Sequence, residues 1–310
     1  MKLGVFIHSG GESVDSLIGR VRDARTAGFE SAFFSQLTSW DSIMVAALAA
    51  REVPGIEVGT SVVQTYPRHP LALAGQALTA RAVSGNAFTL GLGPSHREII
   101  EGAFGLSYDR PARHVREYLS ALIPLLRGEA VEYRGQTLSV AGQVDAPGAS
   151  APPVLLSALG PVMLRIAGEL TDGTVTTWTG AQAIAEHIVP RITEAARAAG
   201  RPSPRVVASA MIVITDDPER VRSEVSARLG FAGNFAGYRS MLERQGLSGV
   251  HETVIAGDER TVEKAISRYA DAGATDLLVS PVGNEREQAH TLDFLRGRTL
   301  KRDVRAPAAG

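Results

Sequence analysis

The sequence predicts a single α/β domain folded as a (β/α)8 TIM barrel. Short apolar runs alternate with longer amphipathic stretches along almost all of the 310 residues. Strands that are separated by helical crossovers pair in parallel, and runs that are apolar on both faces are typical of a parallel sheet covered by helices. Nine strand candidates occur outside a small hairpin. Placing the candidate at 251–257 outside the ring leaves the eight strands that a closed barrel needs.

Each element follows from its own pattern. Strands are predicted where apolar or β-branched residues run together, at 3–7, 31–35, 56–63, 88–92, 153–159, 173–177, 206–214 and 275–280. Helices are predicted where apolar residues recur with helical spacing, at 13–27, 40–51, 70–84, 111–128, 161–169, 181–199, 217–229 and 285–298. Trp40 opens the second of these helices, and Asp109 with Pro111 supplies the cap and first turn of the fourth.

Three pieces interrupt the repeat and predict insertions. Residues 131–140 predict a hairpin that turns at Arg134-Gly135, and 141–152 is a loop rich in alanine, glycine and proline. Residues 231–250 form a late insertion that leads into the extra strand at 251–257. The barrel domain is therefore expected to span 1–302, with 303–310 as a flexible tail.

An open, doubly wound sheet is the alternative fold. It would favour a G-x-G-x-x-G turn after the first strand, where the phosphates of a dinucleotide approach the backbone. The chain instead has His8-Ser9-Gly10-Gly11-Glu12 there. This turn lacks the glycine spacing, so the sequence favours the barrel.

Composition excludes several functions. Charged residues are 21% of the chain and the net charge is −1, which does not indicate nucleic acid or an anionic membrane as a partner. No apolar run reaches the roughly eighteen residues of a membrane span. The absence of cysteine excludes disulfides, thiolate metal sites and cysteine nucleophiles. A cytoplasmic protein is expected.

Polar, aromatic and glycine residues follow the predicted strands. Active sites of such barrels lie at the carboxyl ends of the strands. The residues found there are His8, Gln36, Trp40, Gln64, Tyr66, Arg68, His69, Gly93, His96, Leu159, Gly160, Thr177 and Trp178. Carboxylates are scarce among them, which argues against a divalent metal site and against glycoside hydrolysis by paired carboxylates.

Several of these residues also have a structural interpretation. His69 precedes Pro70 and suits the first turn of a helix, and Trp40 could serve packing as well as a pocket. His96 follows a tight Gly-Pro-Ser turn at the functional end of a strand, so it could contact a ligand. Gly160-Pro161 could admit an anion to backbone N–H groups or form an ordinary turn. The segment GLGPS lacks the G-x-S-x-G spacing of a serine hydrolase.

Three longer motifs resemble the bacterial-luciferase-like oxidoreductases. They are GTSVVQTYPRHPLALAGQALTA, LGLGPSHREIIEGAFGLSYDRPARHVREYL and ALGPVMLRIAGELTDGTVTTWTG. Their order and spacing resemble in particular the branch of the luciferase-like monooxygenase superfamily that depends on the deazaflavin coenzyme F-420. The resemblance covers the chain from its first strand to about Phe294. It implies a barrel of the luciferase type with a flat redox ring across its carboxyl-terminal mouth.

The resemblance also implies roles for individual residues. Ser61-Val62 would form a non-prolyl cis peptide in a bulge that supports the ring, and Gln64 and Tyr66 would line the pocket beyond it. The remaining implied cofactor contacts are Gln36, Trp40, Gly93, Leu159, Gly160 and Thr177, with Arg286 near an anionic tail. Related sugar-phosphate dehydrogenases have an Asp-His pair where this chain has Ser35-Gln36, and a lysine where it has Gly180. Oxidation of sugar phosphates is therefore not expected.

The implied reaction is hydride transfer between carbon 5 of the deazaflavin and a C=C, C=N or C=O bond of a small organic substrate. His96, His8 or Tyr66 would handle the accompanying proton. An FMN-dependent monooxygenase that uses reduced FMN and oxygen is the alternative, and a non-catalytic flavin-binding barrel is a third hypothesis. The resemblance allows a homodimer and a separate reductase as partners. No metal, nucleic acid or membrane partner is expected.

Overall fold

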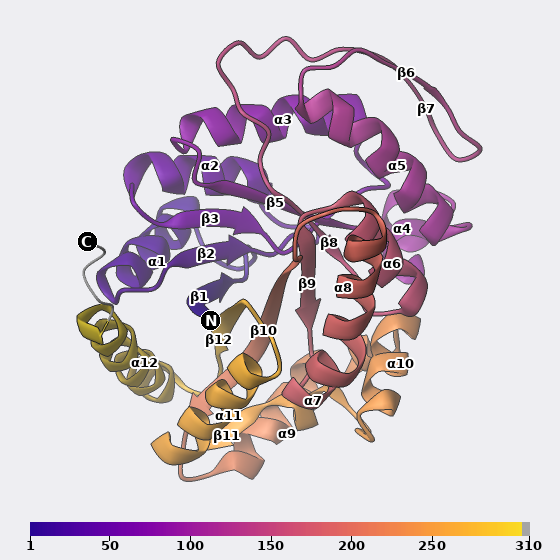
Figure 1. Cartoon of the computed structure of the whole chain (residues 1–310). Helices are drawn as coiled ribbons and strands as arrows, with labels where there is room; N and C mark the ends of the chain where they lie inside the picture. The colour runs from indigo at the N-terminus through magenta and orange to yellow at the C-terminus, as the bar shows by residue number, and fades with distance from the viewer. Residues whose placement is uncertain (306–310) are drawn as a thin grey trace.

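Eight parallel strands close into a ring in this computed structural model, which describes residues 1–305, with side chains through residue 297 (Figure 1). The strands, in order around the ring, are β1 (Lys2–Ile7), β2 (Ser31–Phe34), β3 (Glu57–Thr60), β5 (Phe88–Gly93), β8 (Val154–Ser157), β9 (Gly173–Thr177), β10 (Arg205–Ile214) and β12 (Asp276–Pro281). The ring closes because β12 pairs with both β1 and β10. The predicted TIM barrel is confirmed.

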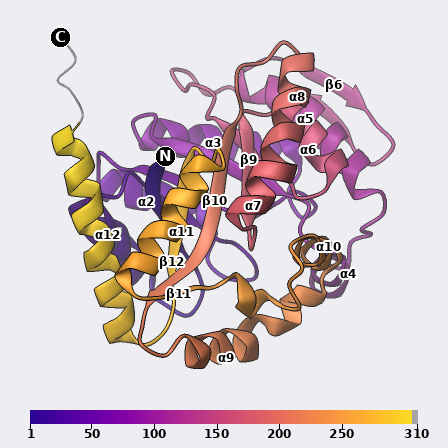
Figure 2. The ribbon, with the colours of Figure 1, turned by 60° about the horizontal axis from the view of Figure 1, so that its bottom comes forward.

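Helices surround the ring, as Figures 1 and 2 show from two directions. They are α1 (Val14–Thr26), α2 (Ser42–Glu52), α3 (Pro70–Val83), α4 (Arg97–Phe104), α5 (Pro111–Leu126), α6 (Pro161–Leu170), α7 (Ala181–Ala183), α8 (Val189–Ala198), α9 (Pro218–Leu229), α10 (Ala236–Arg244), α11 (Glu259–Asp271) and α12 (Glu285–Arg305). A π-helical turn, η1 (Ile184–Ile188), joins α7 to α8, and the 3-10 turns η2 (Gly230–Asn234) and η3 (Val250–Thr253) flank α10. The apolar core lies between helices and ring.

The strand predicted at 56–63 is interrupted. A cis peptide joins Ser61 to Val62, and the chain resumes as β4 (Val63–Gln64), which pairs with β5. The chain at this interruption packs closely on β5. A Cβ added at Gly91 would lie only 1.9 Å from the carbonyl oxygen of Thr60. The Thr60 hydroxyl donates to the Gly91 carbonyl oxygen at 2.7 Å. Glycine at 91 is thus a requirement of the bulge.

Several predicted boundaries were wrong. Trp40 does not open α2, because Asp41 is the N-cap and accepts from two backbone N–H groups of the first turn. The residue before α5 is Arg110 in a left-handed conformation, so Asp109 is not its cap. Helix α4 was not predicted, and α12 continues to Arg305. The remainder of the expected tail, 306–310, lies outside the described residues.

The insertions attach to opposite sides of the barrel. Strands β6 (Val131–Arg134) and β7 (Ser139–Gly142) form the predicted hairpin, with the turn at 135–138. Glu117 of α5 holds this turn by accepting from the backbone N–H groups of Gln136 and Thr137 at 3.0 and 2.8 Å. The extra strand is shorter than expected: β11 (Ile255–Gly257) pairs only with β10 and lies outside the ring, as predicted.

A partly buried ion cluster joins three strands at the end of the barrel where the strands begin. The Arg205 guanidinium donates to the carboxylates of Glu57 and Asp276, each at a shortest distance of 2.6 Å. Burial lowers the pKa of Arg205, but the hydrogen bonds to Asp276 and Glu57 outweigh it and raise the pKa above its ordinary value. Three strands are therefore held together at their amino ends, which leaves the opposite end as the open mouth.

No helix among the residues that the structure describes has both the length and the apolar character needed to cross a lipid bilayer.

Candidate active site

A cavity of about 300 Å³ opens at the carboxyl-terminal mouth of the barrel. We call it the ring cavity. Residues at or just beyond the ends of all eight barrel strands line it, among them Phe6, His8, Ser35, Gln36, Ser61, Val62, Gln64, Ser95, His96, Ser157, Thr176, Thr177, Trp178, Ser209, Met211 and Ser280. Parallel strands present their carboxyl ends together, so residues from across the whole sequence converge here.

The lining of the ring cavity is uncharged. It combines serine and threonine hydroxyls on the strand ends with apolar and aromatic side chains, and it contains no lysine, arginine, aspartate or glutamate. Among the described residues, no group of three or more histidine, aspartate or glutamate side chains is placed to hold a metal ion. Such a cavity suits a flat, largely apolar ligand with polar edges.

Gln64 lines this cavity and carries a buried acceptor that has no hydrogen-bond partner. Its amide nitrogen donates to the carbonyl oxygens of Gln36 and Leu37 at 3.2 and 3.3 Å. Reversing the amide would set oxygen against two carbonyl oxygens, so the orientation is fixed. The Oε1 atom has no partner although Gln64 is only 3% exposed. A buried acceptor left in this way is complementary to an N–H group of a ligand.

Thr176 carries a second unpartnered group. The Thr176 hydroxyl is buried and lacks a hydrogen bond, whereas its neighbour Thr177 lies 3.3 Å from the hydroxyl of Ser209. Both threonines line the ring cavity. The two orphaned groups, on Gln64 and Thr176, mark positions where a bound molecule would complete the hydrogen bonding.

The cis peptide forms one wall of the cavity. Both Ser61 and Val62 line it. Behind them, a Cβ at Gly93 would lie 3.2 Å from a Val62 methyl group and 3.1 Å from Ser157, so only glycine fits without displacement. Gly93 itself does not line the cavity. It lets the bulge and β8 approach β5, which is a structural contribution to the wall.

His96 lies among aromatic rings at the edge of the cavity. Its imidazole is stacked on Phe235 at 4.5 Å and lies 4.6 Å from Tyr238, both from the late insertion. Tyr238 in turn packs on Trp178 at 4.4 Å. Burial lowers the pKa of His96 below 6.5, so the imidazole is neutral at neutral pH. The neutral ring is able to accept a proton from a ligand in the cavity.

His8 also lines the ring cavity, at the end of β1. It is exposed to solvent at its edge and packs against Phe6, with ring centroids 4.9 Å apart. The pKa of His8 is lowered mainly because the surrounding protein removes water from the imidazole. The positive charges of Arg228 and Arg20 lower it further. His8 is therefore a second neutral imidazole at the same cavity.

Tyr66 does not reach the ring cavity. It lines a separate hollow of about 460 Å³, where it stacks on His114 at 3.9 Å and on Tyr108 at 5.1 Å. Burial raises the pKa of Tyr66 to about 12. The structure thus separates Tyr66 from His96 and His8, the other two residues predicted to handle the proton.

His69 caps α3, because its side chain accepts from the backbone N–H of Leu71. This agrees with the structural interpretation of His69 as a residue of the helix start.

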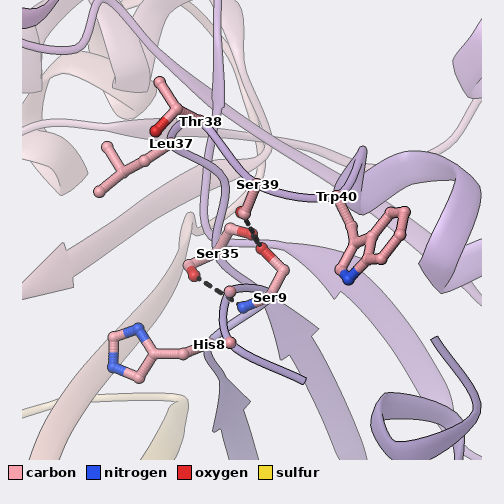
Figure 3. A pocket seen from close by; sticks show the side chains of 9 residues that line it. His8, Ser9, Ser35, Leu37, Thr38, Ser39 and Trp40 are labelled. Carbon is pink, nitrogen blue, oxygen red and sulfur yellow. Dashed lines mark hydrogen bonds between the residues drawn. The ribbon is translucent and has the colours of Figure 1, made fainter. Parts of the chain in front are cut away.

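Trp40 lies in a hollow of about 740 Å³ beside the ring cavity (Figure 3). Its indole N–H donates to the carbonyl oxygen of Glu12 at 2.8 Å, and about half of the side chain is exposed. Gln36 supports the same segment, because its side-chain oxygen accepts from the backbone N–H and the hydroxyl of Ser42. Trp40 is therefore adjacent to the ring cavity without lining it.

Leu159 and Gly160 also lie outside the lining. Gly160 is the N-cap of α6, and no side chain caps the helix. A Cβ at Gly160 would meet nothing within 4 Å, so space is open at this helix end. The His187 imidazole, on the π-helical turn, forms a hydrogen bond with the Leu159 carbonyl oxygen at 2.7 Å and fixes the turn before α6.

Arg286 is exposed in the first turn of α12 and does not line the ring cavity.

A family model described as luciferase-like monooxygenase matches residues 1–276 of this chain. The chain belongs to the luciferase-like monooxygenase family.

Relatives of this family member are reductases and monooxygenases. The 5,10-methylenetetrahydromethanopterin reductase of Methanopyrus kandleri is 26% identical, over 87% of this chain and 90% of that protein. The solved coenzyme F-420 dependent tetrahydromethanopterin reductase from Methanopyrus kandleri superposes with a TM-score of 0.82 at 24% identity, over 97% of this chain and 99% of the other. The oxygenating constituent of 3,6-diketocamphane monooxygenase from Pseudomonas putida, solved with FMN, gives 0.75 at 18% identity, over 96% of both chains.

Several lining residues of this luciferase-like protein were missing from the predicted site. Phe235 and Tyr238 belong to an insertion that gave no local signal of function, so only the folded chain brings them over the mouth. Ser157 and Thr176 occupy strand ends, where position along the strand could have indicated them. Trp178 was noted after its strand but not assigned to the site, and its φ of 51° turns it toward Tyr238.

Proposed function

We propose that this protein is a coenzyme F-420-dependent oxidoreductase that transfers a hydride between the deazaflavin and an uncharged organic substrate. The observation that carries the proposal is the uncharged ring cavity with the unpartnered Gln64 acceptor above the Ser61–Val62 bulge. The relative named a methylenetetrahydromethanopterin reductase supports the reaction class. The F-420-dependent reductase with the same fold supports the choice of cofactor.

The described residues fit a deazaflavin in three respects. Gln64 Oε1 and the Thr176 hydroxyl lack partners, and the pyrimidine edge of the ring offers both N–H and carbonyl groups. The apolar side of Val62 and the hydroxyls around the mouth suit a flat ring with polar edges. The uncapped amino end of α6 after Gly160 offers backbone N–H groups and a positive dipole end to a phosphate on the cofactor's side chain.

The chemistry divides between cofactor and protein. A bound deazaflavin supplies the carbon that donates or accepts the hydride. The protein orients the substrate and excludes water with Phe235, Tyr238 and Trp178. In the reducing direction a C=C, C=N or C=O bond gains a hydride and a proton, and in the reverse direction an alcohol loses both. His96 is the proposed partner for the proton at its imidazole nitrogen, with His8 as the second candidate.

The uncharged lining also limits the substrate. A phosphate or carboxylate in the ring cavity would lose its hydration without gaining a cationic partner there. Gly180, which occupies the position of a lysine in the resembled sugar-phosphate dehydrogenases, adds no charge. Neutral ketones, enones, imines and alcohols are therefore the proposed substrates.

An FMN-dependent monooxygenase is the second candidate, favoured by the family's name and by the FMN-bound structure of the same fold. Spectral titration of the purified protein with F-420 and, separately, with FMN tests the choice. We expect tighter binding of F-420, and turnover of at least one neutral enone, imine or alcohol. Tighter binding of FMN would overturn the cofactor assignment, and binding without turnover across such a panel would favour a non-catalytic barrel.

A further inference from the structure

The ring cavity continues into a second hollow, which we call the annex. The annex is the hollow of about 740 Å³ lined by 8–11, Ser35 and 37–40. It shares His8, Ser35 and Leu37 with the ring cavity, so the two spaces meet at these side chains. Figure 3 shows His8 and Leu37 on one side of the annex, Trp40 on the other, and three serines between them.

The small volume of the ring cavity indicates that part of the bound ligands occupies the annex. Sites for a single small molecule occupy about 300–1,000 Å³, and the ring cavity, at about 300 Å³, lies at the lower limit. A hydride-transfer site must hold cofactor and substrate in contact at the same time. The space that the second molecule requires is therefore available in the annex rather than in the ring cavity alone.

The chemistry of the annex indicates what it would hold. The side chains of Leu37 and Trp40 are 53% and 49% exposed, which is unusual for large apolar groups beside a site. Between them, the Ser9 hydroxyl donates to the Ser35 carbonyl oxygen and lies 2.9 Å from the hydroxyl of Ser39. Glu12 follows this lining in the chain but does not line the annex, and its carboxylate accepts from Ser16 and Arg20. The annex thus offers apolar surface, and none of its lining residues is a lysine, arginine, aspartate or glutamate.

The two adjacent glycines keep the annex open. A Cβ at Gly10 would meet only the Ser39 Cβ, at 3.6 Å, and a Cβ at Gly11 would meet nothing within 4 Å. Side chains at these positions would project into empty space rather than into the core. A valine at Gly10 therefore fits the fold and occupies part of the annex.

We infer that the substrate is an uncharged molecule of two parts, with its reacting bond in the ring cavity and a second aromatic or alicyclic group packed on Trp40 and Leu37 in the annex. This inference rests on the proposed function, which it extends to a substrate class. It sets the enzyme apart from one that acts on small ketones or on phosphorylated substrates.

The chain's two tryptophans allow each space to be observed separately, because Trp178 lines the ring cavity and Trp40 lines the annex. Chalcone, an uncharged enone with two aromatic rings, is the probe, and 2-cyclohexenone and 4-carboxychalcone are its small and charged counterparts. In the Trp178→Phe variant, we expect chalcone to quench the emission of Trp40. In otherwise native protein, Gly10→Val should raise the chalcone Kd about tenfold and leave the Kd values of F-420 and 2-cyclohexenone within twofold.

Gly75→Val is the matched control, since a Cβ at Gly75 also meets nothing within 4 Å but lies on α3, away from both spaces. It should bind all probes as the native protein does, and 4-carboxychalcone should bind native protein more weakly than chalcone. Equal chalcone affinity for native protein and Gly10→Val, or no chalcone binding at all, would overturn the inference. Failure of F-420 to bind would instead defeat the proposed function, whether or not chalcone quenches Trp40.

Discussion

The side-chain amide of Gln64 donates to the carbonyl oxygen of Gln36 at 3.2 Å, and this contact ties β4 to the segment after β2. Gln64 lines the ring cavity, and its Oε1 atom is buried without a protein hydrogen-bond partner. Gln64 thus joins the bulge to the segment after β2 and offers the acceptor that we propose for an N–H group of the cofactor.

Replacing Gln64 by methionine should weaken cofactor binding. The loss of one buried hydrogen bond costs about 1–3 kcal/mol, which corresponds to a rise in the F-420 Kd of roughly 5- to 150-fold. Spectral titration of the variant measures it. Gln76→Met, the same change on the exposed face of α3, is the control and should leave the Kd unaltered. An unchanged Kd in Gln64→Met would remove Gln64 from the cofactor site.

His96 should determine the acid side of the pH profile. Burial lowers its pKa below 6.5, so the base form is complete at neutral pH, and the rate of alcohol oxidation should fall only as the pH drops through that lowered value. His96→Asn should reduce kcat about 10²–10⁴-fold and abolish this acid limb. His8→Asn is the comparison variant. If it removes the limb instead, His8 is the proton partner.

The barrel could be predicted from sequence because each strand–helix repeat carries its own local signal. Alternation of apolar runs and amphipathic stretches does not depend on distant contacts, so the eight ring strands were all indicated. The mouth could be predicted in outline for the same reason, since it consists of whatever follows each strand. His8, Gln36, Gln64, His96 and Thr177 were identified in this way and line the cavity.

The remaining features of the site could not be predicted, because the spacing of residues in the sequence does not determine where the chain turns after each strand. Tyr66 follows Gln64 by two residues, yet β4 ends at Gln64 and the chain then turns toward His114, a residue almost fifty positions away. Phe235, just before α10, reaches His96, just before α4, only because the late insertion folds back toward the mouth of the barrel. Such contacts are tertiary, and no period or cap in the local sequence reports them.

The ion cluster at the closed end of the barrel should be needed for stability. Arg205→Met leaves the buried carboxylate of Asp276 and the partly buried carboxylate of Glu57 without their cation, and the loss should approach the roughly 3–5 kcal/mol that breaking a fully buried ion pair costs (about 3 kcal/mol here). Urea denaturation measures the change. Arg22→Met is the control, because the Arg22–Glu52 pair is exposed and should contribute about 0–1 kcal/mol. Equal effects of the two changes would contradict the structural role of the cluster.

The homodimer that the resemblance allows has a candidate surface on α2. Met44 and Leu48, one turn apart, expose 65% and 46% of their side chains, and residues at this spacing share a helix face. If the protein is a dimer through this face, Met44→Glu with Leu48→Glu should yield monomers in light-scattering measurements. Val162→Glu, at an exposed apolar position on α6, should not alter the mass. A monomeric native protein would contradict a dimer through α2.

Because of His114, the free energy of unfolding should decrease as the pH falls from about 6.5 to about 4. The imidazole is buried, lies 3.0 Å from the Thr65 hydroxyl and has a pKa lowered to about 4, by burial and against the opposing effect of Glu117. The ordinary pKa of about 6.5 applies to the unfolded chain. The unfolded state therefore binds the proton first as the pH falls, so the folded state is fully stabilised above pH 6.5 and loses about 3 kcal/mol by pH 4. Carboxylates also titrate in this range, so the measurement is the difference in unfolding free energy between native protein and His114→Phe at pH 7 and pH 4. The native protein should lose more stability than the variant, and parallel losses in the two proteins would show that His114 is not the group responsible.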